Sequence, residues 1–150
     1  MTGPIILPTD FSEHSAVALS WAHKISVLFD APIHCVYVMR EAGMYPGTEF
    51  VPAAFISADD MAQQVNEEMA RFSAKHELGS DTKAVVLIGT PFVEIVRYAR
   101  AQDAAMIVMS THGYGGLKHV LLGSTTEAVV RKASCPVLSV PASEDEFEMP

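Results

Sequence analysis

Residues 4–39 read PIILPTDFSEHSAVALSWAHKISVLFDAPIHCVYVM. The apolar runs at 5–7 and 33–39 are short and continuous, as in strands that are buried on both faces of a sheet. Between them, apolar side chains recur at helical spacing over residues 13–29, and Ser12 stands where the N-cap of that helix is expected. The stretch therefore predicts a strand, a helix and a second strand, the repeating unit of an α/β protein.

The same alternation continues to residue 140. The further predicted elements are a long loop at 40–57, a helix at 58–78 with Gly79 as its C′ residue, a strand at 82–88, a helix opened by the N-cap Thr90 and by Pro91, a strand at 105–110, a helix at about 124–133 and a strand at 136–140. Short apolar strands separated by helices are typical of a parallel sheet that is covered on both faces. We therefore predict a single α/β domain at residues 1–142, with a Rossmann-like, five-stranded parallel sheet, and an acidic tail at 143–150.

The overall composition is that of a soluble, acidic protein. The 150 residues include 10 Lys and Arg against 18 Asp and Glu, which gives a formal net charge of −8 and a pI near 5.1. That balance argues against binding to nucleic acid or to anionic membranes, which requires clustered basic side chains. The chain shows no signal peptide and no membrane-spanning apolar run, and its two cysteines cannot form a disulfide framework. These observations predict a cytoplasmic protein.

The negative charge is unevenly distributed along the chain. The tail at 143–150 carries four acidic residues, whereas residues 104–126 contain none. Since like charges repel, an anionic ligand is tolerated best beside that acid-free stretch. In parallel sheets, ligands bind beyond the carboxyl ends of the strands, where the strand order reverses. The segments expected at that edge are 8–10, 38–39, 89–90 and 110–113.

A glycine-rich loop that leads into a helix is the strongest local signal. Residues 110–116 read STHGYGG and residues 123–126 read GSTT. Glycines let backbone amides approach phosphate oxygens, and a helix N-terminus adds unpaired N–H groups and partial positive charge. The pattern indicates a phosphate site with hydroxyl donors at 124–126. The alternative is structural, because Ser124 and Glu127 match a capping box and the glycines could form a simple turn.

Other candidate residues stand at the strand ends. The Asp10 carboxylate could accept hydrogen bonds from a ribose or a base amine, or it could serve as a helix-entry cap beside Ser12. Val38 and Met109 are core residues by type and gain a ligand role only if an adenine lies against them. His112 could hydrogen-bond a phosphate or help to hold a metal ion. The chain has no metal-binding spacing and no nucleophile with its base, so we assign no metal ligand and no catalytic residue.

Three segments in combination resemble the universal stress protein family. They are PTDFS at 8–12, STHG at 110–113 and LLGSTTEAVVRKASCPVLSVP at 121–141, and the resemblance extends over about residues 4–141. The nucleotide-binding branch of that family carries the pattern G-x2-G-x9-G-[ST]. Gly113, Gly123 and Ser124 match its later part, whereas Ser110 replaces its first glycine and adds a side chain there.

The resemblance implies an adenine-nucleotide α-hydrolase-like fold that binds ATP or AMP, accompanied by a divalent cation such as Mg²⁺ or Mn²⁺. It implies that Asp10 contacts the adenine or ribose, framed by Pro8 and Thr9. Val38 would meet the adenine edge through its backbone, with Met109 packed beside it. The residues that would cradle the ribose and phosphates are Ser110, Thr111, His112, Gly113, Tyr114, Gly115, Gly116, Gly123, Ser124, Thr125 and Thr126.

The expected function is a regulatory, ATP- or AMP-binding homodimer with at most slow ATP hydrolysis. The resemblance implies that the dimer forms by edge pairing of the last strand, Pro136–Val140, and that an unidentified partner links it to a stress response. One alternative is a nucleotide-independent, dimeric interaction protein of the same fold, toward which Ser110 is a step. Another is an enzyme of the wider adenine-nucleotide α/β group, but its H-I-G-H and S-G-G-x-D-S signatures are missing from the chain.

Overall fold

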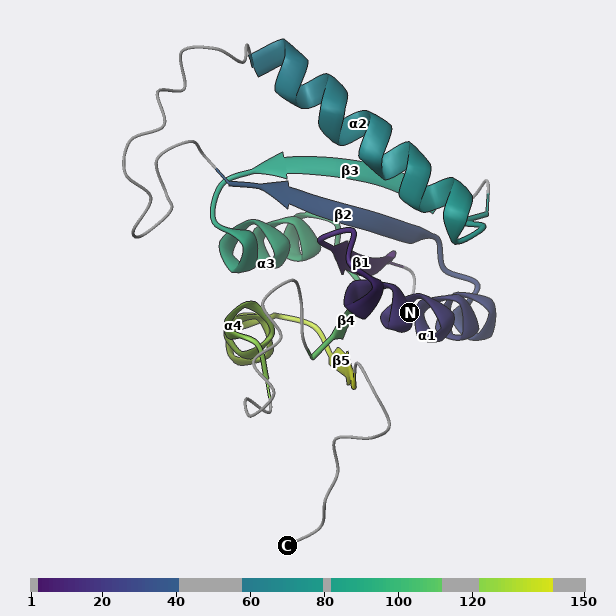
Figure 1. Ribbon diagram of the computed structural model, residues 1–150. Helices are drawn as coiled ribbons and strands as arrows, with labels where there is room; N and C mark the ends of the chain where they lie inside the picture. Colours follow the sequence, from purple (N-terminus) through teal and green to yellow (C-terminus); the bar gives the residue numbers. More distant parts are fainter. Residues whose placement is uncertain (1–2, 41–57, 80–81, 112–121, 142–150) are drawn as a thin grey trace, which may run out of the picture.

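Strands and helices alternate along the chain as the sequence predicts (Figure 1). The computed structural model describes residues 3–40, 58–79, 82–111 and 122–141. The described elements are β1 (Ile5–Thr9), α1 (Glu13–Phe29), β2 (Ile33–Met39), α2 (Ala58–Lys75), β3 (Thr82–Ile88), α3 (Pro91–Ala101), β4 (Met106–Ser110), α4 (Ser124–Lys132) and β5 (Val137–Val140). Beyond Arg40, the loop predicted at 40–57 lies outside the described residues, as does the tail at 143–150.

The five strands form one parallel sheet in the order β3-β2-β1-β4-β5. Ile5 pairs with Ile33 of β2 on one side and with Met106 of β4 on the other, so β1 lies in the middle of the sheet. The chain moves outward from β1 to β3 and then returns to the opposite side of β1. The strand order therefore reverses between β1 and β4, and the predicted α/β fold is confirmed.

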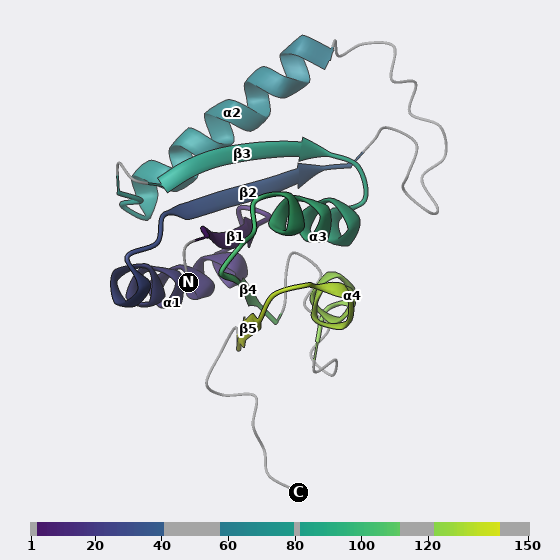
Figure 2. The ribbon, with the colours of Figure 1, turned by 180° about the vertical axis from the view of Figure 1, so that it is seen from behind.

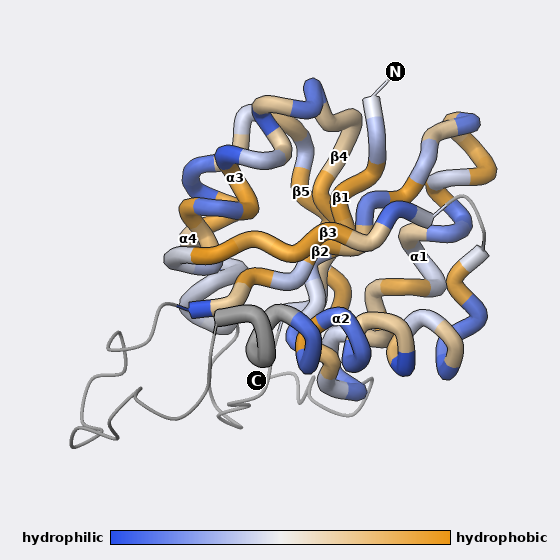
Figure 3. Tube along the Cα trace, turned by 90° about the horizontal axis from the view of Figure 1, so that it is seen from above, coloured by the Kyte–Doolittle hydropathy of each residue, from blue (hydrophilic) through white to orange (hydrophobic). Residues whose placement is uncertain are grey.

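Two helices cover each face of the sheet. Ile5 and Leu7 of β1 pack with side chains of α1 and α2, whereas Ile6 belongs to the core that includes residues of α3 and α4. Figures 2 and 3 show α1 and α2 on one side of the strands and α3 and α4 on the other. Because both faces of β1, β2 and β4 are largely buried, these strands appear in the sequence as continuous apolar runs.

The start of α1 and the end of α2 are stabilised by different hydrogen-bond motifs. The Ser12 side chain caps α1 by accepting a hydrogen bond from the Ser15 amide, as the sequence predicts. Helix α2 ends at Lys75, earlier than the predicted residue 78, and the left-handed position belongs to Glu77 (φ 50°). The prediction of Gly79 as C′ residue is therefore wrong. The Leu78 amide donates to the Ser73 carbonyl (3.0 Å) in a Schellman motif, which lets the Leu78 side chain pack against the core.

β1 extends to Thr9, two residues beyond the predicted apolar run at 5–7, and three further boundaries differ from the prediction by one residue. β4 begins at Met106, β5 begins at Val137, and α4 ends at Lys132. Thr90 occupies the N-cap position of α3 and Pro91 starts the helix, where its missing N–H would have had no partner inside the helix. Within the described ranges, no helix has both the length and the hydropathy that crossing a membrane requires.

Candidate functional site

The carboxyl ends of β1 and β4 meet where the strand order reverses, and the neighbouring strands end at the same edge. The last pairs of β2 with β3 are Val38 with Leu87 and Met39 with Ile88, after which the Gly89 amide donates to the Met39 carbonyl (2.9 Å). In a parallel sheet all strands present their carboxyl ends on one side. The described parts of the four predicted segments therefore share one edge of the sheet, as expected.

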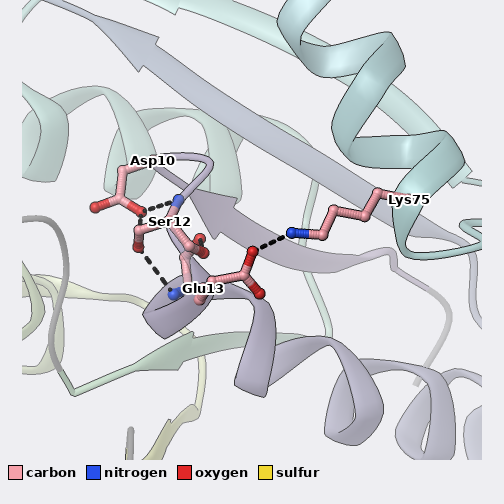
Figure 4. Close-up of polar contacts among 5 residues, drawn as sticks. Asp10, Ser12, Glu13 and Lys75 are labelled. Carbon is pink, nitrogen blue, oxygen red and sulfur yellow. Dashed lines mark hydrogen bonds and ion pairs between the residues drawn. The ribbon is translucent and has the colours of Figure 1, made fainter.

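The turn from β1 into α1 is organised by side-chain hydrogen bonds (Figure 4). The Asp10 Oδ1 atom accepts from both the amide (3.1 Å) and the hydroxyl (2.5 Å) of Ser12. The Ser12 hydroxyl oxygen in turn accepts from the Ser15 amide (3.1 Å), so Asp10 supports the cap of α1. On the outer side of the same turn, Lys75 of α2 forms an ion pair with Glu13.

These contacts show how the Asp10 carboxylate is used within the fold. Its predicted alternative role, a helix-entry cap beside Ser12, is confirmed through Oδ1. In Figure 4 the second carboxylate oxygen of Asp10 points away from Ser12. The cap contact therefore involves the Oδ1 atom of this carboxylate.

Helix α4 is attached to the end of β4 by two hydrogen bonds. The Gly123 amide donates to the Thr111 carbonyl (2.7 Å), and the Thr126 hydroxyl donates to the Ser110 carbonyl (2.9 Å). In addition, the Thr111 amide donates to the Val140 carbonyl (2.9 Å), which ties the same segment to β5. The N-terminus of α4 is therefore held beside the carboxyl ends of β4 and β5.

The alternative interpretation of the start of α4 as a capping box is wrong. Gly123 is the N-cap, no side chain caps the helix among the described residues, and Ser124 is already its first residue. Glu127, which a capping box would turn back toward the N-cap, forms an ion pair with Arg131 instead (2.9 Å). The reason is that the Gly123 amide is bonded to Thr111, so the chain enters the helix one residue earlier than the serine would require.

The start of α4 consequently presents backbone amides. The first bond inside the helix runs from the Glu127 amide to the Gly123 carbonyl (2.9 Å). The amides of Ser124, Thr125 and Thr126 precede it and have no partner within the helix. Together with the partial positive charge of a helix N-terminus, they form a local environment that favours an anion.

The three hydroxyls at the start of α4 differ in their surroundings. The Thr126 side chain is only 4% exposed and donates its hydroxyl hydrogen to Ser110. Ser124 is exposed and Thr125 is half-buried. The hydroxyls suited to donate to an anion are therefore those of Ser124 and Thr125, and the described contact gives Thr126 a structural role.

Val38 and Met109 are buried in the core on the α3 and α4 side of the sheet. Their exposed fractions are 9% and 5%, and both lie near the carboxyl ends of their strands. Pro8 is also buried, and by alternation along β1 it faces the same side as Ile6. These apolar side chains lie in the core next to the sheet edge that carries Asp10 and the start of α4.

The remaining predicted site residues cannot be placed. His112, Gly113, Tyr114, Gly115 and Gly116 lie outside the described residues, so their part in a phosphate cradle stays a prediction.

Two observations concern metal binding and thiol chemistry among the residues that the structure describes. The described residues contain no group of three His, Cys, Asp or Glu side chains that could hold a metal ion. Cys35 is fully buried, and this burial raises the pKa of its thiol to about 12, so the thiolate nucleophile is not formed at neutral pH. The described site is suited to binding an anion.

Comparison with known proteins identifies the family. The sequence model described as the universal stress protein family matches residues 1–141. This chain belongs to the universal stress protein family. Among curated relatives, this universal stress protein is 32% identical over 143 residues to Universal stress protein MJ0531 of Methanocaldococcus jannaschii, a match that covers 95% of this chain and 84% of the relative.

Solved structures of the family share its fold. The structure of MJ0577, from the same archaeon, is 29% identical with a TM-score of 0.78, and the match covers 97% of this chain and 99% of that one. The universal stress protein of Archaeoglobus fulgidus in complex with dAMP is 20% identical with a TM-score of 0.66 over 91% of this chain and 96% of that one. This second likeness shows the fold alone.

The sequence analysis gave no role to Phe11, a residue of this universal stress protein that lies at the candidate site. Phe11 lies between Asp10 and Ser12 with a left-handed backbone (φ 64°), and its ring stacks on Tyr37 of β2. The alternation of apolar residues gives no sign of a left-handed phenylalanine, because the conformation depends on a partner 26 positions away along the chain.

Proposed function

We propose that this universal stress protein binds an adenine nucleotide, ATP or AMP, at the carboxyl ends of β1 and β4 and acts as a regulatory homodimer with at most slow ATP hydrolysis. The observation that carries the proposal is the start of α4, where Gly123 replaces a capping side chain beside the point at which the strand order reverses. A solved relative of the same fold that holds dAMP also supports it.

The proposed contacts follow from the described geometry. The amides of Ser124, Thr125 and Thr126 and the hydroxyls of the first two would hold the phosphates. The predicted glycine loop from Ser110 to Gly116 would close around them. The Asp10 carboxylate would accept from the ribose or the adenine. The adenine would lie at the edge above Val38 and Met109, with the Val38 backbone at its side.

A divalent cation would reach this site together with the nucleotide. In the ranges that the structure describes, no cluster of carboxylate, imidazole or thiolate side chains is available to hold one. We therefore name no protein ligand for Mg²⁺ or Mn²⁺. Such an ion would be bound chiefly through the phosphates of the nucleotide, as is usual for Mg²⁺.

Titration calorimetry with ATP and with AMP tests the nucleotide proposal. The double variant Gly123→Val, Ser124→Ala places a branched side chain at the N-cap and removes one hydroxyl donor. We expect its affinity to fall at least about tenfold, which corresponds to about 1.4 kcal/mol. Gly79→Val, Ser134→Ala is the matched control, because both residues are exposed and the space around Gly79 is open.

The proposal is abandoned if the wild-type protein binds neither nucleotide, or if the double variant binds as tightly as the control. Ser110 favours the second candidate function, a nucleotide-independent dimeric interaction protein, because it replaces a glycine of the family's nucleotide-binding pattern. Under that alternative, dimerisation and partner binding remain in the double variant and no nucleotide binding is measured in either protein.

A further inference from the structure

Phe11 adopts a backbone conformation that bulky residues avoid. Its φ of 64° lies in the left-handed region, where the β-carbon of an L-residue crowds the following carbonyl. Such a conformation persists only where the surrounding structure imposes it, and it is concentrated at functional sites. The residue lies in the turn from β1 to α1, at the sheet edge where we place the nucleotide.

Two sets of contacts hold Phe11 in this conformation. Its amide donates to the Thr9 hydroxyl oxygen (3.0 Å). Its ring stacks on Tyr37 of β2 (centroids 4.5 Å apart, planes 21° apart) and is tilted against Phe72 of α2 (5.8 Å, 59°). Phe72 is in turn in contact with the His76 ring (4.5 Å). The backbone of this turn is therefore fixed by aromatic side chains from two other elements.

The left-handed residue determines where the neighbouring side chains lie. It reverses the chain between Asp10 and Ser12, so that Asp10 Oδ1 reaches both the amide and the hydroxyl of Ser12. Figure 4 shows this arrangement beside the ion pair of Glu13 with Lys75. Because Phe72 and Lys75 both belong to α2, that helix supports the turn at two points.

We infer that Phe11 is a positioning residue for the nucleotide site: its aromatic anchor on Tyr37 and Phe72 holds the Asp10 carboxylate in its binding orientation. The inference rests on the proposed function. Phe11 acts through the backbone of the turn and makes no contact with the nucleotide. The inference also implies that the nucleotide affinity of the site depends on the packing of α2 against the Phe11 ring.

Four variants distinguish a role of Phe11 in positioning Asp10 from a role in filling the hydrophobic core. Phe11→Leu keeps an apolar side chain but removes the stack, Phe11→Gly removes the backbone strain together with the ring, and Phe11→Tyr keeps the stack. Phe29→Leu is the matched control, because Phe29 packs against the same core from the far end of α1. ATP and AMP affinity is measured by calorimetry, and hydrogen exchange of the Ser12 amide by NMR.

We expect Phe11→Leu and Phe11→Gly to bind about tenfold more weakly and to exchange the Ser12 amide faster. Phe11→Tyr is expected to restore the affinity to within about twofold, and Phe29→Leu to leave affinity and exchange unchanged. Equal affinity and equal Ser12 exchange in Phe11→Leu and wild type would overturn the inference. If the wild type binds no nucleotide, the proposed function and the binding role of Phe11 both fail, while Ser12 exchange still reports whether Phe11 orders the turn.

Discussion

His34, which is buried, pairs with the half-buried Tyr98 on the α3 side of the sheet. The Tyr98 hydroxyl and His34 Nδ1 are 3.0 Å apart, and their rings are in contact. Burial raises the pKa of Tyr98, so its hydroxyl keeps its proton and can donate it to the imidazole. Burial, and secondarily the positive charge of Lys83, lower the pKa of His34. The folded protein therefore favours the neutral imidazole.

This lowered pKa predicts a pH dependence of stability. As the pH falls below about 6.5, the unfolded chain protonates His34 while the folded protein resists doing so. The free energy of unfolding should consequently decrease between pH 7.5 and pH 5.5 and level off once the folded histidine is also protonated. Denaturation in urea across this range should show a weaker decrease in His34→Gln. The exposed His14→Gln is the control, and identical curves for both variants would contradict the assignment.

At the scale of elements, the position of α4 depends on its attachment to β4. The Thr126 hydroxyl is the side-chain part of that attachment, and its acceptor, the Ser110 carbonyl, lies at the buried end of the strand. Removing the donor of a buried carbonyl lowers the stability of the fold, because the carbonyl loses in the protein a hydrogen bond that it would make in water. The same bond holds the start of α4, whose backbone amides we propose to bind the phosphates.

Thr126→Val tests this attachment, because it exchanges the hydroxyl for a methyl group of similar size. We expect the free energy of unfolding to fall by about 1–2 kcal/mol. Thr125→Val, at a half-buried neighbour, should change it by about 0.5 kcal/mol or less. Urea denaturation monitored by circular dichroism measures both. Equal stability of the two variants would show that the bond makes no net contribution.

At the scale of the whole molecule, β5 is an edge strand with one side unpaired in the described sheet. The Pro136 carbonyl accepts from the Ile107 amide and the Val140 carbonyl accepts from the Thr111 amide (each 2.9 Å), so these residues face β4. By the alternation of a strand, Val137 and Ser139 direct their amides and carbonyls to the open edge. Our proposed homodimer would pair this edge with its copy.

Ser139→Pro is the sharpest test of that dimer. Proline removes an amide that points to the open edge and leaves the hydrogen bonds between β4 and β5 in place. We expect sedimentation equilibrium to give twice the 16.2 kDa of the chain for the wild type and for the control Ser139→Ala, and the monomer mass for Ser139→Pro. A proline variant that remains dimeric would place the interface elsewhere.

Local sequence features predicted most of the elements because the interactions behind them are local. Ser12 bonds to an amide three positions away, and Pro91 is compatible with a helix start whatever surrounds it. The location of the candidate site was predictable in part, because Asp10 follows a strand end, Gly123 precedes a helix, and parallel strands end at one edge of the sheet.

The tertiary structure decided the features that depend on distant partners. Phe11 is left-handed because Tyr37 and Phe72 hold its ring, and Gly123 caps α4 because its amide reaches Thr111. Leu78 ends α2 early because the core accepts its side chain. Each of these contacts joins residues that are apart in the sequence and come together only in the folded protein. The sequence by itself therefore determined the α/β alternation and the sheet edge that carries the candidate site, whereas packing between distant segments decided the conformation of the residues at that edge.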